Sequence, residues 1–168
     1  MKNALWDNIF RHWQSPESPA VLVLKQTAIF QELTAKELRE IEPWLHQRLY
    51  KPGEIIFKHH APGEGVYIIL SGAVEISIID ANGKKNILAQ LQQGDFFGEF
   101  SLLDGGERSA TAIATDHTTL LGFFRPDLFS LMDRNPRMGN KLLLALAKVV
   151  VARLRKTTEL LIQQQSMS

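Results

Sequence analysis

The middle of the chain consists of short runs of apolar and β-branched residues separated by turn residues. Residues 75–78 (Glu-Ile-Ser-Ile) alternate between polar and apolar, which is the pattern of a half-buried strand. Asn82-Gly83 is a strong signal for a hairpin between two strands. Many short strands at close spacing favour a sandwich or a closed barrel. The predicted strands are 48–50, 54–59, 66–70, 73–79, 86–91, 109–115 and 119–124.

Two segments before the strands have the spacing of amphipathic helices. Trp6 and Trp13, with Ile and Phe at positions 9 and 10 between them, fall on one helical face, and the prolines at 16 and 19 break this segment. We expect that face to pack on its own domain or on a partner subunit rather than on a membrane surface. Further along, Thr34 and Glu37 have the spacing of a capping box. They predict a helix that runs to about Leu45.

The last part of the chain is predicted to be helical. Pro126 begins a short helix that ends near Asp133, before Asn135-Pro136. A second helix, of about 28 residues, follows from Arg137. Seven of its residues recur in alternating steps of three and four, which is the spacing of the contact line, or seam, of a coiled coil. This predicted seam consists of Leu143, Leu146, Val150, Arg153, Thr157, Leu160 and Gln164. This helix either lies along its own barrel or joins a second copy in a symmetric dimer, and we favour the dimer.

The composition is that of an ordinary globular protein of one domain. The chain has 168 residues, of which 45% are hydrophobic and 22% charged, and its formal net charge is +1. This balance favours neither nucleic acid nor a membrane as a partner. The absence of cysteine excludes disulfides, thiolate metal sites and cysteine nucleophiles. There is no signal-peptide pattern and no apolar run of roughly 18 residues, so we expect a cytoplasmic protein.

The segment 94–111 carries the residue types that a sugar phosphate requires. Gly98 lets the backbone approach a ligand closely, and Glu99 can accept hydrogen bonds from a sugar hydroxyl. Residues 100–103 can form a short helical turn whose free N–H groups attract an anion. Arg108 offers a planar, permanently charged fork to a phosphate, and Ser109 adds a hydroxyl donor. The alternative is a hairpin in which Glu99 and Arg108 only pair with each other on the surface.

The order and spacing of these residues resemble the phosphate-binding cassette of the cyclic nucleotide-binding domain. That pattern reads Phe-Gly-Glu, an apolar residue, a small residue, two apolar residues and a short turn, followed by Arg, a small residue, Ala, and Ser or Thr. In this chain it covers residues 97–103 and 108–111. The ligand-binding residues that the resemblance implies in the cassette are Gly98, Glu99, Phe100, Ser101, Arg108, Ser109, Ala110 and Thr111.

The resemblance covers about residues 28–165 and implies an α+β fold. The expected architecture is an eight-stranded antiparallel β-roll, a double-stranded jelly-roll barrel, with N-terminal helices and a long C-terminal helix. It divides the chain into a helical extension (1–24), the β-roll with flanking helices (25–134), and a long helix that serves as lid and dimer contact (135–168).

One position departs from the family pattern, since His60-Ala61 stands where the family has Gly-Asp. A local rearrangement of that turn is therefore expected. The neighbouring pair His59-His60 is not expected to bind a metal, because adjacent strand residues point to opposite faces.

A second group of residues lies on the long helix. Residues 153–159 (Arg-Leu-Arg-Lys-Thr-Thr-Glu) resemble the middle of the long helix of bacterial catabolite activator proteins, where the pattern is Arg-Leu, two residues, Thr-Ser-Glu. In that family the arginine supports the ligand and its glutamate. The first hydroxyl meets the adenine edge, and the next one does so from the other subunit. Carried over by position, these roles fall to Arg153, Thr157 and Thr158, although two threonines on a long helix can also simply be solvated.

The residues and the resemblance together predict a regulatory module that binds a cyclic nucleotide and signals through its C-terminal helix. We favour cAMP because of Thr157 and Thr158, while Ser109 and Thr111 leave cGMP open. One alternative is a degenerate domain that acts as a protein-interaction scaffold without a ligand. Another is an enzyme on a cupin-like barrel, which needs a His/Glu metal cluster. None of the five histidines sits at ligand spacing on a strand, so we expect neither catalysis nor a metal.

The expected partners are the cyclic nucleotide and, through the C-terminal helix, a second copy of the chain. We expect no membrane partner. No recognition helix follows the long helix within the sequence, so we also expect no DNA binding by this chain alone. The sequence does not identify a downstream protein partner.

Overall fold

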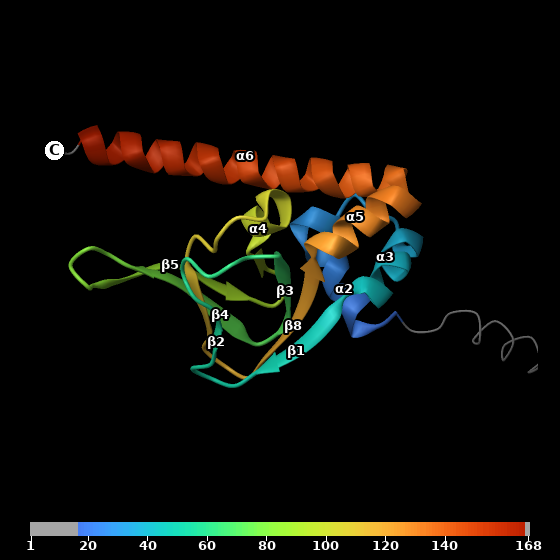
Figure 1. Ribbon diagram of the computed structural model, residues 1–168, viewed down its shortest axis with the longest axis horizontal. Helices are drawn as coiled ribbons and strands as arrows, with labels where there is room; N and C mark the ends of the chain where they lie inside the picture. Colours follow the sequence, from blue (N-terminus) through green and yellow to red (C-terminus); the bar gives the residue numbers. More distant parts are fainter. Residues whose placement is uncertain (1–16, 167–168) are drawn as a thin grey trace, which may run out of the picture.

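The computed structural model describes residues 17–166, in which helices lie before and after a central block of strands (Figure 1). The predicted face of Trp6 and Trp13 lies outside the described residues. The helices are α2 (Pro19–Gln26), α3 (Ala35–Ile41), α4 (Glu99–Asp104), α5 (Arg125–Arg134) and α6 (Pro136–Ser166), with the 3₁₀ turns η1 (Ala28–Phe30) and η2 (Glu42–Trp44).

The strands form two four-stranded sheets, ordered β1-β8-β3-β6 and β2-β7-β4-β5, in which neighbouring strands pair antiparallel. This arrangement is the predicted eight-stranded β-roll. No ladder joins the edges of the two sheets within residues 17–166, so the roll is not a closed barrel. The strands are β1 (His46–Tyr50), β2 (Ile55–Phe57), β3 (Gly65–Ser71), β4 (Ala73–Ile79), β5 (Lys85–Gln92), β6 (Phe96–Phe97), β7 (Thr111–Ala114) and β8 (Thr118–Phe124).

Strand β3 lies at the centre of the molecule and is buried on both of its faces. Val66 and Ile68 pack into a cluster with α2, α3, α5 and α6. Tyr67 and Ile69 face the other way, into a second cluster between the two sheets. This double burial explains why the sequence of β3 is a continuous apolar run rather than an alternating one.

Helix α2 begins at Pro19, a position predicted from the sequence to be part of a break within the helical extension. Ser18 begins the helix as its N-cap by accepting a hydrogen bond from Val21 N, and Pro19 occupies the first turn. Val21 and Leu24 are fully buried in the cluster that contains the outer face of β3. The helix therefore crosses the boundary predicted between residues 24 and 25 and packs as part of the β-roll.

The capping box of α3 is confirmed, but the helix is shorter than expected. The Thr34 hydroxyl accepts from Glu37 N at 3.2 Å, and Thr34 N donates to the Glu37 carboxylate at 2.7 Å. The helix ends at Ile41 instead of near Leu45, and the turn η2 follows. Pro43 explains this ending, because it lacks the N–H that would continue the helical hydrogen bonds.

The alternation of β4 places the polar side chains in an unexpected environment. Glu75 and Ser77 are buried, whereas Ile76 and Ile78 are only half-buried. Glu75 forms an ion pair with Lys85 at 2.5 Å, which stabilises its carboxylate. The pattern therefore identified a strand correctly but did not identify which face is buried.

Helix α6 runs along one side of the whole molecule, and its C-terminal half extends past the other helices (Figure 1). Its first half is buried through Met138, Leu142 and Leu146. From Val151 to Gln163 every residue is exposed. None of the helices within residues 17–166 is long and apolar enough to cross a membrane.

The N-terminal part of the predicted seam of α6 faces its own domain. Leu146 is fully buried in the chain's own core, and Leu143 packs against the same cluster. Farther along this face, Arg153 forms an ion pair with Glu99 of the roll. The expectation that Leu146 forms a dimer contact was wrong, because a stripe of apolar residues does not specify the surface that covers it.

Candidate functional site

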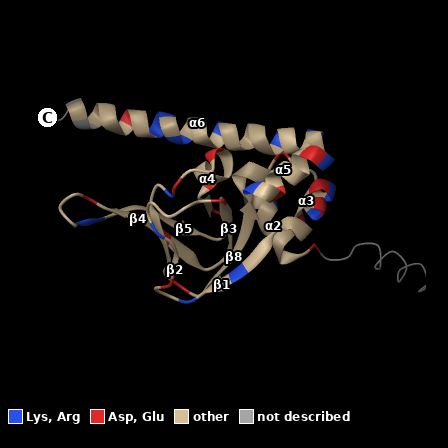
Figure 2. Cartoon of the chain, in the orientation of Figure 1, with Lys and Arg blue, Asp and Glu red and all other residues tan. Residues whose placement is uncertain are grey.

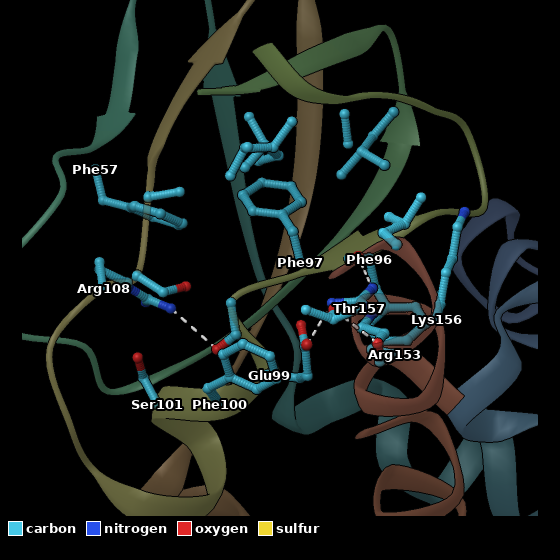
Figure 3. A pocket seen from close by; sticks show the side chains of 18 residues that line it. Phe57, Phe96, Phe97, Glu99, Phe100, Ser101, Arg108, Arg153, Lys156 and Thr157 are labelled. Carbon is cyan, nitrogen blue, oxygen red and sulfur yellow. Dashed lines mark hydrogen bonds and ion pairs between the residues drawn. The ribbon is translucent and has the colours of Figure 1, made fainter. Parts of the chain in front are cut away.

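A pocket of about 420 Å³ lies between α4, the β4–β5 hairpin and α6 (Figure 3). Nine of the predicted ligand-binding residues line it, so the structure brings together segments more than forty residues apart in the chain. They are Gly98, Glu99, Phe100, Ser101, Arg108, Ser109, Ala110, Arg153 and Thr157.

Arg108 is a buried cation at one side of this pocket. Its Nη1 donates to the carbonyl oxygens of Gly65 at 2.7 Å and Gly98 at 3.1 Å, and its guanidinium lies 4.2 Å from the centre of the Phe57 ring. Its Nε is buried without a hydrogen-bond partner. Burial lowers the pKa of Arg108, yet an arginine in a protein stays protonated. The site therefore presents a fixed positive charge with unused donor capacity.

Gly98 allows the backbone to pass close to this cation. It adopts a left-handed conformation, with φ +82°, directly before α4. A Cβ atom added there would lie 2.3 Å from Arg108 Nη1. Any other residue at this position would therefore displace the guanidinium.

Glu99 is almost completely buried and forms an ion pair with Arg153 of α6. The Arg153 side chain also donates to the Phe96 carbonyl at 3.4 Å and lies 5.2 Å from the centre of the Phe96 ring. The alternative of a Glu99–Arg108 pair on the surface was wrong, because both residues are buried and Glu99 pairs elsewhere. The Glu99–Arg153 contact links the long helix directly to the cassette.

Two predicted residues do not line the pocket. Thr111 lies on β7, where its hydroxyl accepts a hydrogen bond from His59 N at 3.0 Å. Thr158 is exposed on α6 and donates to the Leu154 carbonyl at 3.0 Å. Its neighbour Thr157 donates to the Arg153 carbonyl at 2.9 Å and does line the pocket. The two threonines therefore point in different directions, as neighbours on a helix must.

Sequence reasoning missed most of the apolar wall and part of the α6 contribution. Residues 153, 156, 157 and 160 follow helical spacing, which was a signal that Lys156 and Leu160 share a face with Arg153 and Thr157. The signal for the wall was weaker, because it depends on how the hairpin folds over the cassette. The missed residues are Phe57, Ile76, Leu88, Ala89, Leu91, Phe96, Phe97, Lys156 and Leu160.

The turn with the unusual His60-Ala61 pair lies beside the loop that carries Arg108. Strand β2 ends at Phe57, so His59 and His60 are in a turn, and their rings stack at 3.8 Å instead of facing apart as expected. His60 adopts φ +64° and its Nδ1 lies 2.9 Å from the Glu107 carboxylate. Within residues 17–166 no group of three or more metal-ligating side chains could hold a metal ion.

Comparison with known proteins gives matches over most of the chain. The family model of the cyclic nucleotide-binding domain matches residues 47–135. A cyclic AMP receptor protein of Thermus thermophilus is 37% identical over 125 residues, which cover 74% of this chain and 58% of that protein. A CRP-like cAMP-activated global transcriptional regulator of Mycobacterium tuberculosis is 30% identical over 80% of this chain and 58% of its own. The chain thus spans a little over half the length of these relatives.

Solved structures agree with this result. The catabolite activator protein of Thermus thermophilus superposes with a TM-score of 0.76 and 34% identity, over 83% of this chain and 63% of that chain. The N-terminal domain of a transcriptional regulator from Streptomyces coelicolor gives a TM-score of 0.73 and 29% identity, over 83% of this chain and 94% of that one.

Proposed function

Because the chain belongs to the cyclic nucleotide-binding domain family, we propose that its pocket binds a cyclic nucleotide, with cAMP as the favoured ligand. The observation that carries the proposal is the buried guanidinium of Arg108. Its Nε has no hydrogen-bond partner, and no carboxylate among the described residues forms an ion pair with it. A phosphate would supply both the missing acceptor and the missing negative charge.

The other pocket residues suit the remaining parts of a cyclic nucleotide. Ser109 adds a hydroxyl beside Arg108 for the phosphate, and Glu99 offers carboxylate oxygens to the ribose hydroxyl. The base would then lie toward α6. The Thr157 hydroxyl already donates its hydrogen to the Arg153 carbonyl, so it is left as an acceptor for the amino group of adenine.

A titration tests the proposal directly. The full chain is titrated with cAMP, cGMP and 5′-AMP while the melting temperature and the heat of binding are recorded. A specific ligand at 100 times its Kd should stabilise the fold by about 2.7 kcal/mol, and 5′-AMP, which lacks the cyclic phosphodiester, should stabilise it far less. If neither cyclic nucleotide stabilised the protein, the alternative of a scaffold domain without a ligand would be favoured.

We also propose a symmetric dimer through α6, on a face that lies one residue, or about 100°, around the helix from the predicted seam. The large apolar residues of this face are exposed, at 46% to 64%. The steps between its members alternate between three and four, as in a coiled coil. This outer stripe consists of Leu144, Ala147, Val151, Leu154, Thr158 and Leu161. Thr158 would then reach the ligand of the partner subunit.

Signal output would pass through the position of α6. Helix α6 is connected to the pocket by the Glu99–Arg153 ion pair and by Thr157, among the residues of its lining face. We assume that α6 exchanges between a position close to the pocket and one farther from it. A ligand that contacts these residues shifts that equilibrium by the difference between its affinities for the two positions. Amide exchange of residues 145–165 should therefore slow when cAMP is added. Unchanged exchange in a protein that binds cAMP would mean that the signal leaves by another surface.

The role proposed for the chain is a cytoplasmic, non-catalytic regulatory module. Residues 17–134 form the sensing unit and residues 135–166 form the output helix in this proposal. The downstream protein would be bound by whichever surface α6 exposes or covers.

A further inference from the structure

The face of α6 that lines the pocket carries a lysine to which the proposed function assigns no role. Lys156 lines the pocket together with Arg153, Thr157 and Leu160. Figure 3 shows its side chain at the side of the pocket opposite Arg108, with the nitrogen directed away from the Glu99–Arg153 pair.

The ammonium group of Lys156 differs from the other cations that connect α6 to the domain. Figure 2 shows several Lys and Arg residues along this helix, and three of them end on glutamates: Lys141 on Glu37, Lys148 on Glu32 and Arg153 on Glu99. Lys156 has no ion pair or hydrogen-bond partner within residues 17–166. Its three N–H donors are therefore available to a ligand in the pocket.

The orientation of the nucleotide in the pocket follows from the proposed function, on which this inference rests. If the phosphate lies at Arg108, the base lies at the opposite side, where Lys156 and Thr157 contribute to the wall. The two side chains have opposite hydrogen-bonding character. Thr157 is left as an acceptor, because its hydrogen is used by the Arg153 carbonyl. Lys156 can only donate.

Purine bases differ at the same edge. Guanine presents two acceptors there, N7 and O6, whereas adenine presents the N7 acceptor and an N6 donor. An ammonium group can therefore donate to O6 of guanine but finds no acceptor at N6 of adenine. We propose that Lys156 is a specificity-determining residue that admits cyclic nucleotides with a 6-oxopurine base, such as cGMP, into a site whose Thr157 favours cAMP.

The test compares three ligands and four proteins. Dissociation constants are measured for cAMP, cGMP and cyclic IMP, which has the O6 and N7 of guanine without its 2-amino group. The proteins are the wild type, Lys156→Met, Lys156→Arg, and Arg155→Met as a control at an exposed position of the same helix that does not line the pocket. Lys156→Met should lower the affinity for cGMP and cyclic IMP by about five- to tenfold and leave that for cAMP within about twofold. Lys156→Arg should keep the wild-type ratios.

Two outcomes would overturn the role of Lys156 while leaving the proposed function intact. One is an equal loss for all three ligands in Lys156→Met, which would indicate general attraction of the phosphate charge. The other is an unchanged affinity for all three ligands in Lys156→Met, which would mean that the ammonium group does not contact the base. A wild type that binds no cyclic nucleotide would overturn both this inference and the proposed function.

Discussion

At the scale of single residues, the site depends on a cation that the fold keeps out of water. Arg108 is only 5% exposed, and desolvation lowers its pKa because burial disfavours a charged form. Two backbone carbonyls and the Phe57 ring offset part of this cost. The free protein therefore holds an incompletely satisfied charge, which a ligand phosphate would satisfy.

Arg108→Ala should nearly abolish cAMP binding. The buried phosphate would lose its charged partner but keep its desolvation cost, so the loss should be about 3 kcal/mol or more, which is over a hundredfold in Kd. Isothermal titration calorimetry measures it. Arg155→Ala, at an exposed position of α6 that does not line the pocket, is the control and should bind normally. Equal affinities in the two variants would contradict the phosphate role.

Gly98 and Gly83 provide a matched pair of alanine substitutions. Both have a left-handed backbone, with φ +82° and +79°, but a Cβ would meet Arg108 only at Gly98, and at Gly83 it would meet nothing within 4 Å. Gly83→Ala should therefore cost only the backbone strain, about 1 kcal/mol of stability, and leave binding unchanged. Gly98→Ala should cost more and abolish cAMP binding. Urea denaturation and titration of both variants check this, and similar behaviour would argue against the close approach.

At the scale of elements, α6 carries two apolar stripes, one buried in its own domain and one exposed. Leu146→Glu places a charge in the chain's own core and should cost more than about 3 kcal/mol, so the protein should largely unfold. Leu154→Glu changes an exposed position of the outer stripe and should give folded monomers. Circular dichroism separates the two effects, and light scattering reports the mass. A folded Leu154→Glu dimer would exclude the outer stripe as the interface.

Helix α3 is connected to α6 by an ion pair that should make stability depend on acid. Burial alone would raise the pKa of Glu37, but hydrogen bonds from Lys141 and Thr34 outweigh it and hold that pKa below the usual 4.5. A lowered carboxyl pKa contributes stability that is complete above the unfolded value and is lost as the pH falls through the folded value. Glu37→Gln should therefore destabilise the protein at pH 7 but much less at pH 3. Denaturation at both pH values measures the difference, and a pH-independent effect would contradict the pair's role.

At the scale of the whole molecule, the site and the dimer should be coupled through neighbouring threonines. Thr157 lines the pocket of its own chain, whereas Thr158 is on the outer stripe. Removing both hydroxyls should lower cAMP affinity by roughly 1–3 kcal/mol. In the monomeric Leu154→Glu background, Thr157→Ala should still weaken binding, while Thr158→Ala should have no effect. Titrations of the single and combined variants measure this, and a Thr158 effect in the monomer would exclude action from the partner subunit.

The sequence by itself determined the parts of this protein that depend on local chemistry. The glycine, glutamate and arginine of the cassette were identified because their types and spacing are specific, and the structure brings Gly98, Glu99 and Arg108 into one pocket. The capping box of α3 and the extent of β4, residues 73–79, were likewise correct, since capping and hairpin signals act between near neighbours.

Only the tertiary structure decided which surfaces meet. The spacing of α6 was consistent with packing either on the chain's own domain or on a second copy of the chain. The burial of Leu146 in the chain's own core shows that this part of the helix packs on its own domain. Similarly, the alternation of β4 did not show that Glu75 would be buried with Lys85 as its partner. The physical reason is that periodicity fixes which residues share a face, whereas the occupant of that face is set by packing between segments that are distant in the chain.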